Sequence, residues 1–248
     1  MSEATISLIV FAFVFGGVFL GMFLRTVLPQ HHLIDASKDI VRLGFAMVIT
    51  ITALVLGLLV ASAKAHYDAQ GADLTQMSAK IVLLDRVLAH YGPETKEVRA
   101  QLQADVILML DQVWSQSGTP AAPSSHGITV LFDKVQELSP RGDAQRSLQA
   151  QALNIALALG QTRWLMYEQS AFKIPKPMLV MLAFWLTIIF ISFGLFAPKN
   201  SMVVASLFFS ALAVSGAVFL VLEGYTPFAG WIRLSSAPLR AALALLGQ

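Results

Sequence analysis

Small and polar side chains recur at three- and four-residue steps between positions 46 and 64. This spacing places side chains on one face of a helix. The members are small, carry a hydroxyl or, at the end, a positive charge: Ala46, Thr50, Ala53, Gly57, Ala61 and Lys64. Such a face can line a passage for ions, and a basic residue at its mouth would attract anions. The same face also suits close helix packing, because membrane helices prefer small residues at their contacts.

A second group with possible chemistry combines imidazole and carboxylate side chains near position 35. His32, Asp35 and Asp39 can share a helix face, and His31 precedes them. Histidine and aspartate side chains can bind metal ions. Adjacent histidines point in different directions, however, so we expect a solvated loop end and no metal site.

The other polar residues do not form a pattern typical of catalysis. There is no nucleophile beside a base and orienting group, no phosphate-binding loop and no cysteine. Asp85 and Arg86, neighbours in the sequence, are expected to form a solvated or intersubunit pair. A net charge of +2 does not favour nucleic acid. We therefore expect neither an enzyme nor a bound cofactor.

The small-residue face, apart from Lys64 at its end, belongs to one of four long uncharged stretches. These are Ala4–Leu24, Leu43–Ala63, Pro177–Pro198 and Asn200–Leu222. Each reaches the roughly 20 residues that a helix needs to cross a bilayer, and backbone in lipid must satisfy its own hydrogen bonds. Only 13% of the residues are charged, against about 25% in soluble proteins. The sequence therefore predicts an all-α membrane protein with four transmembrane helices.

Small residues also recur in two other spans. Gly17 and Gly21 form a GxxxG pair in the first span. The fourth span carries a face of Ser206, Ser210, Ala213 and Ala217. For both sets we expect helix packing. The absence of ionisable residues from all four spans argues against a proton-coupled transporter but leaves a passive channel open.

The polar interval 64–176 is expected to fold as a helical domain. One apolar stripe recurs at helical spacing: Leu74, Met77, Ile81, Leu84 and Leu88. Because no helix breaker precedes Gly92, this stripe should lie on one long helix continuous with the second span. A further helix should start near Glu94 and bury Val98, Leu102, Val106, Leu110 and Val113.

The rest of the interval predicts a loop over 118–127, a short helix over Ile128–Leu138 and a long helix from Ser139-Pro140 to about Ser170. The long helix is apolar on two sides. Leu148, Ala152, Ile155 and Leu159 line one side, and Leu153, Leu157, Gly160 and Trp164 line the other. A helix of this kind is buried between other helices or between subunits.

The expected organisation has four parts. Residues 4–63 form the first helix pair, 64–176 the helical domain, 177–222 a second helix hairpin and 223–248 a tail with a short helix over Pro238–Leu246. Basic residues near the spans number seven on the side of the helical domain and four on the opposite side. The positive-inside rule then places the domain and both termini in the cytoplasm.

Several blocks of the chain resemble the bacterial bestrophin-like domain family of four-helix membrane proteins. They are LPQHHLIDASKDIVRLG (Leu28–Gly44), LVLGLLVASAKAHYDAQ (Leu54–Gln70), LLDRVLAHYGPE (Leu83–Glu94) and FWLTIIFISFGLFAPKNS (Phe184–Ser201). A run after the last span resembles a reduced bestrophin segment: Glu223, Pro227, Phe228 and Gly230. The resemblance implies a bacterial inner-membrane protein.

The more distant likeness to bestrophins implies a pentameric ion channel whose second membrane helix lines the pore. Two features depart from bestrophins. Bestrophin pores narrow at bulky apolar and aromatic residues of the second helix. Here the second span has Phe45 as its one aromatic residue, and the other bulky residues that could narrow a pore are Val48, Ile51, Val55 and Leu58. The acidic cluster of the calcium clasp is reduced to Glu223, so calcium gating is not expected. The alternative is a non-conducting membrane scaffold whose helical domain binds a partner through the two-sided helix.

Overall fold

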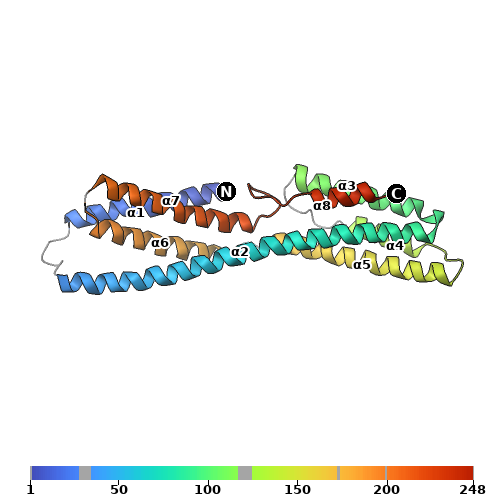
Figure 1. Ribbon diagram of the computed structural model, residues 1–248, viewed down its shortest axis with the longest axis horizontal. Helices are drawn as coiled ribbons and strands as arrows, with labels where there is room; N and C mark the ends of the chain where they lie inside the picture. The colour runs from blue at the N-terminus through green and yellow to red at the C-terminus, as the bar shows by residue number, and fades with distance from the viewer. Residues whose placement is uncertain (1, 28–34, 117–124, 172–173, 199, 248) are drawn as a thin grey trace. The chain divides into compact units, whose positions relative to one another are not determined.

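The computed structural model describes residues 2–27, 35–116, 125–171, 174–198 and 200–247 (Figure 1). Within these ranges the regular elements are all helical: α1 (Glu3–Val27), α2 (Asp35–Tyr91), α3 (Lys96–Asp111), α4 (Ser125–Gln136), α5 (Asp143–Ala171), α6 (Lys176–Phe196), α7 (Ser201–Gly224) and α8 (Ala237–Leu245). A 3-10 turn (Pro93–Thr95) precedes α3 and a π turn (Gln112–Gln116) follows it. The prediction of an all-α chain is confirmed for this part of the molecule.

Four helices are long and apolar enough to cross a membrane, and they coincide with the four predicted stretches. They are α1, the portion of α2 that begins at Leu43, α6 and α7. The chain is therefore a membrane protein. The ends differ from the prediction by a few residues because polar residues can extend a helix past the apolar region. Arg25, for example, lies inside α1 and donates a hydrogen bond to the carbonyl oxygen of Ala197.

The chain divides into two compact units. The first contains Met1–Ala65 and Ile174–Tyr225, and the second contains His66–Lys173 and Thr226–Gln248. Helix α2 supplies residues to both and is uninterrupted from Asp35 to Tyr91, as the absence of a breaker predicts. It ends at Tyr91, directly before Gly92, whose φ of 137° is a conformation that other residues rarely adopt.

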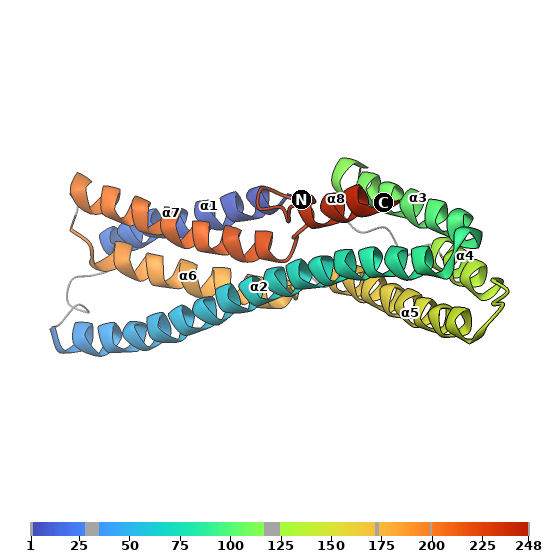
Figure 2. The same cartoon turned by 45° about the vertical axis from the view of Figure 1, so that its right-hand side comes forward.

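In the first unit, α1, α6 and α7 lie side by side (Figures 1 and 2). Gly17 lies against Thr187 and Gly21 against Ile191, so α1 and α6 run in the same direction. A Cβ atom at Gly21 would collide with the Ile191 carbonyl oxygen, and one at Gly194 would collide with that of Val18. Glycine at these positions therefore allows two helix backbones to touch.

Helix α7 returns antiparallel to α1 and α6. Its start is capped by Asn200, whose side chain accepts a hydrogen bond from the Met202 amide at 3.1 Å. Further along, the buried Ser7 hydroxyl of α1 donates to the Ser215 carbonyl at 2.7 Å. The Phe208 ring packs edge-on against Phe11 with 5.5 Å between ring centroids.

The core of the second unit is built on the predicted stripe of α2. Each residue of that stripe is at most 1% exposed, and it packs with side chains of α3, α4, α5 and α8. Val98, Leu102, Val106 and Val113 are buried as predicted, whereas Leu110 is only half-buried. The short C-terminal helix also joins this core, through Leu239 and Ala242.

Helix α5 starts later than predicted. It begins at Asp143 and not at Ser139-Pro140. The Gly142 carbonyl accepts from the Arg146 amide, and the Arg141 amide donates to the Gln145 side chain at 2.8 Å. These bonds satisfy backbone groups at the start of the helix beside a glycine, whereas Ser139 and Pro140 lie outside any regular element.

Candidate functional site

The six residues of the predicted small-residue face are all exposed on the chain. The opposite side of α2 is covered: Thr52, Leu59 and Ala63 are 2%, 5% and 3% exposed. Leu59 and Ala63 belong to the first unit's core, and the Ser62 hydroxyl lies 2.9 Å from that of Tyr225 at the end of α7. These contacts fix which side of α2 faces away from its own chain.

Packing within the chain does not explain the small-residue face. Among the described residues, no heavy atom that could obstruct a Cβ at Gly57 lies within 4 Å. Only 11% of the most apolar window of α2 is buried, against 28% in α1 and 33% in α6. Helix α2 is thus the least covered of the four membrane helices. Its open side is available to a water-filled passage, to a second copy of the chain or to lipid.

The exposed surface of α2 has a second strip, formed by large apolar side chains. Met47, Ile51, Leu54 and Leu58 are 43–67% exposed and lie beside the small-residue face. Of the bulky candidates for a constriction, Val48 and Val55 instead pack against the first unit's core. Ile51 and Leu58 are therefore the bulky candidates that remain available to a partner or a passage.

The two polar members of the face differ in what they offer. The Thr50 hydroxyl donates to the Ala46 carbonyl at 2.9 Å, so its oxygen lone pairs remain for an outside group. Lys64 ends the face with an exposed side chain. A cation could meet the Thr50 oxygen, whereas an anion would be attracted at Lys64.

The other predicted packing residues behave differently from one another. Gly17 and Gly21 lie against α6, as described above. In α7, however, Ser206, Ser210 and Ala213 are exposed and Ala217 is half-buried. The buried side of α7 consists of Ala211, Ser215, Val218 and Val221. The serine and alanine face of α7 is thus available to lipid or to another subunit.

The tail run does not form a single site. Glu223 is buried at the end of α7 in the first unit, whereas Pro227, Phe228 and Gly230 belong to the second. Phe228 is 2% exposed and packs edge-on against Trp114, with ring centroids 5.8 Å apart.

A compact turn holds the tail in place. The Trp114 indole donates to the Leu234 carbonyl at 2.9 Å, and the Leu234 amide donates to Pro227 at 2.7 Å. Gly230 adopts φ 79°, which favours glycine. The aromatic and glycine residues of the run therefore build the second unit's core and its connecting turn.

The described residues contain no group of three or more histidine, aspartate and glutamate side chains able to hold a metal. His31 and His32 lie outside the described residues, as do the side chains of Asp35 and Asp39.

The expectation that Asp85 is solvated or pairs with another subunit is wrong. Asp85 is 1% exposed and forms a two-pronged ion pair with Arg99 of α3, at 2.7 Å and 2.8 Å. The Gly247 amide donates to the same carboxylate at 3.3 Å. Arg86, by contrast, is exposed. The signal that sequence reasoning missed is the position of Asp85 four residues after Ile81, within the buried stripe, where a carboxylate needs a partner.

Two oppositely charged side chains line a small cavity of about 30 Å³ in the second unit. Asp105 of α3 and Arg163 of α5 line it together with apolar side chains such as Met77 and Leu159. Burial raises the pKa of the Asp105 carboxyl, which accepts a hydrogen bond from Gln101 at 3.0 Å. Burial likewise lowers the pKa of Arg163. The sequence offered no spacing signal for this pair, because its members lie on different helices.

The chain matches a known protein family over most of its length. The bestrophin-like domain matches residues 11–239, which covers both membrane helix pairs and the helical interval. The chain belongs to the bestrophin-like family. Among curated proteins, no sequence matches this bestrophin-like chain.

Solved structures with the same fold come from bacterial bestrophin homologues. A mutant of the Klebsiella pneumoniae homologue aligns with a TM-score of 0.69 at 13% identity, covering 100% of this chain and 99% of that one. The homologue from the same organism solved by zinc phasing gives 0.65 at 14% identity, covering 93% and 96%. At such low identity these similarities establish that the bestrophin-like chain shares the fold of those homologues.

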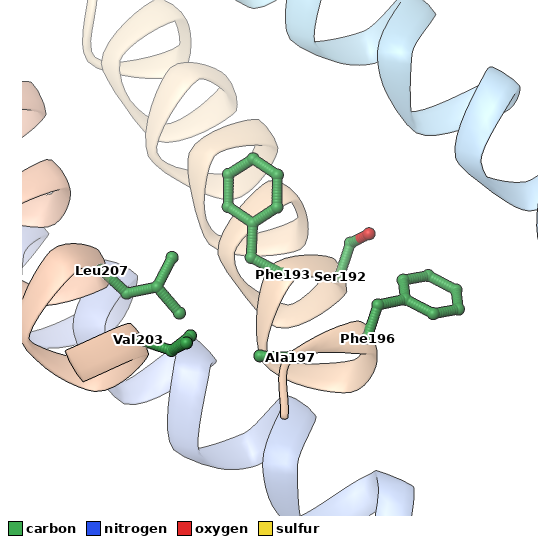
Figure 3. A pocket seen from close by; sticks show the side chains of 6 residues that line it. All are labelled: Ser192, Phe193, Phe196, Ala197, Val203 and Leu207. Atoms are coloured by element: carbon green, nitrogen blue, oxygen red, sulfur yellow. The ribbon is translucent and has the colours of Figure 1, made fainter. Parts of the chain in front are cut away.

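A pocket of about 400 Å³ lies where α6 meets α7 in the bestrophin-like chain (Figure 3). Its lining is apolar apart from Ser192: Phe193, Phe196, Ala197, Val203 and Leu207. In Figure 3 the Ser192 hydroxyl and the Phe196 ring point away from Val203 and Leu207. This lining lacks charged groups, so we assign it no chemistry.

Proposed function

We propose that this bestrophin-like chain forms a homo-oligomeric ion channel whose passage is lined by α2. One observation carries the proposal: the small-residue face is the open side of the least covered membrane helix. With several copies around an axis, that face would surround water while the buried side of α2 stays anchored to its own chain. The likeness to bestrophins favours five copies.

The proposal assigns different roles to the two exposed strips of α2. Ala46, Thr50, Ala53, Gly57 and Ala61 face the passage, where small side chains leave room for a hydrated ion. The neighbouring strip containing Leu54 and Leu58 would contact the next subunit or narrow the passage. Lys64 from each copy forms a basic ring that raises the local concentration of anions. We therefore propose a preference for anions.

The proposed setting is the bacterial inner membrane. The helical domain, residues 64–176, is inserted between the second and third spans and lies in the cytoplasm with both termini. The tail 223–248 returns to it through the buried Phe228. Lipid, inorganic ions and further copies of the chain are the proposed partners.

Cysteine substitution tests the passage directly, because the natural chain contains no cysteine. We expect purified Thr50→Cys and Gly57→Cys to conduct in planar bilayers and to lose most of their current after a water-soluble thiol reagent is added. Thr52→Cys is the matched control: it lies on the buried side and should keep its current under the reagent. Lys64→Glu should shift the reversal potential toward cation preference.

Two outcomes would contradict the channel. A folded oligomer without current in any salt would exclude conduction. Current insensitive to modification at positions 50 and 57 would remove this face from the passage.

The alternative function, a non-conducting scaffold, is supported by the second unit. On α5, Leu157 and Trp164 are 51% and 52% exposed, whereas Ala152 and Leu159 on the other side are buried. An exposed apolar patch suits a protein partner. In a scaffold, Gly57→Trp would disturb assembly, whereas Trp164→Ala would abolish partner binding and leave the oligomer intact.

A further inference from the structure

A groove on the surface of the first unit has no role in the proposed passage. It lies between α1 and α6 and has a volume of about 410 Å³. Its rim consists of side chains that are 40–65% exposed: Ile9 and Phe13 from α1, and Val180 and Phe184 from α6. Val10, in contrast, is 5% exposed and closes the floor. The groove is therefore a concave apolar surface built into two membrane-spanning helices.

The lining of the groove is almost entirely apolar. Thr187 is the polar residue of its lining, and its hydroxyl donates to the Ala183 carbonyl at 2.7 Å. The lining covers positions 6–13 of α1 and 179–187 of α6. At ~1.5 Å per residue the groove runs roughly 12 Å along both helices. A flexible hydrocarbon chain fits such a surface and gains contacts on three sides.

Charged residues lie at the end of the groove where both helices begin. Lys176 precedes Val180 by four residues and therefore shares its face of α6. Its side chain is exposed. Glu3 precedes Ile6 by three residues on α1. An ammonium group and a carboxylate thus stand at the same end of an apolar groove.

We propose that the α1–α6 groove binds one acyl chain of a zwitterionic phospholipid. Lys176 meets the lipid phosphate, and Glu3 meets the ammonium of an ethanolamine head group. Charge complementarity at the head and an apolar wall at the tail identify this occupant. A second copy of the chain would leave the two charged residues without such a match. The site depends on the membrane location of the helices and not on whether α2 conducts ions.

Native mass spectrometry of the full-length protein tests the site. The protein is reconstituted in vesicles of phosphatidylethanolamine and phosphatidylglycerol and then extracted into mild detergent. We expect wild type to retain about one phospholipid per chain, mainly phosphatidylethanolamine. Ala183→Trp fills the groove and should lose that lipid. Phe209→Trp enlarges an exposed ring on α7, outside the lining of the groove, and should keep it.

Lys176→Gln gives a second measurement that leaves the groove open. Because one basic side chain near the membrane surface contributes modestly, we expect retention to weaken by about fivefold. Equal lipid retention by wild type and Ala183→Trp, with both proteins folded, would overturn the proposal. Wild type that retains no lipid would also overturn it, as would unchanged retention in Lys176→Gln.

Discussion

Asp85 is enclosed by an arginine side chain and a backbone amide from two different parts of the second unit. Arg99 neutralises its charge with two short hydrogen bonds, and the Gly247 amide adds a third. Such a pair gives little net stability compared with apolar residues, but it is costly to break, because the remaining charge loses its partner. Asp85 therefore holds α2, α3 and the tail together.

Replacing Asp85 by alanine should lower the free energy of unfolding by about 3 kcal/mol. Denaturant unfolding of the detergent-solubilised protein measures the change. Asp143→Ala is the control, because Asp143 forms an exposed pair with Arg146 at 3.0 Å. We expect a change below about 1 kcal/mol for that control. Equal effects at the two positions would show that Asp85 is not held as described.

Helix contacts in the first unit depend on the absence of side chains at a few positions. Gly21 of α1 and Gly194 of α6 bring the two backbones into contact, and Gly17 continues the same seam. Gly16, its neighbour, lies on the open side of α1. The two kinds of glycine should therefore respond differently to an added methyl group.

Gly21→Ala should destabilise the first unit by about 1–3 kcal/mol, because α1 and α6 must move apart. Gly16→Ala should leave stability unchanged or raise it slightly, since alanine favours the helix. Thermal unfolding in detergent compares the two variants. A Gly21→Ala protein as stable as Gly16→Ala would contradict the close contact of α1 with α6.

The sequence is enough to predict the helices but not which of their faces contact one another. The length of the stretches without a charged residue is enough to find the four spans. The spacing of the apolar residues from Leu74 to Leu88 is enough to find the buried side of α2 in the second unit. Periodicity shows which residues share a face but not which face the rest of the chain covers. For that reason the exposure of Gly57, and of the α7 serines, needed the structure. The Asp85–Arg99 pair joins two helices across a turn, and no local pattern encodes it.

The complete chain should cross the membrane in one orientation. We predict that Gly142→Cys in the helical domain reacts with a large impermeant maleimide only in inside-out vesicles. Ser201→Cys lies at the start of α7, at the other end of that helix from the tail, and should react only in intact cells. Both positions are exposed, and the natural chain has no competing thiol. The reverse labelling pattern would place the helical domain outside the cytoplasm.

The second unit is assembled from two separated segments, and this order affects how the protein is made. Its core includes Phe228 and Leu239, which the ribosome adds only after α6 and α7. The core formed by nascent α2, α3 and α5 therefore stays incomplete while two more spans enter the membrane. Intermediates of this kind expose apolar surface and are prone to aggregate. Slow insertion of the last hairpin would consequently be seen as misfolding of the second unit.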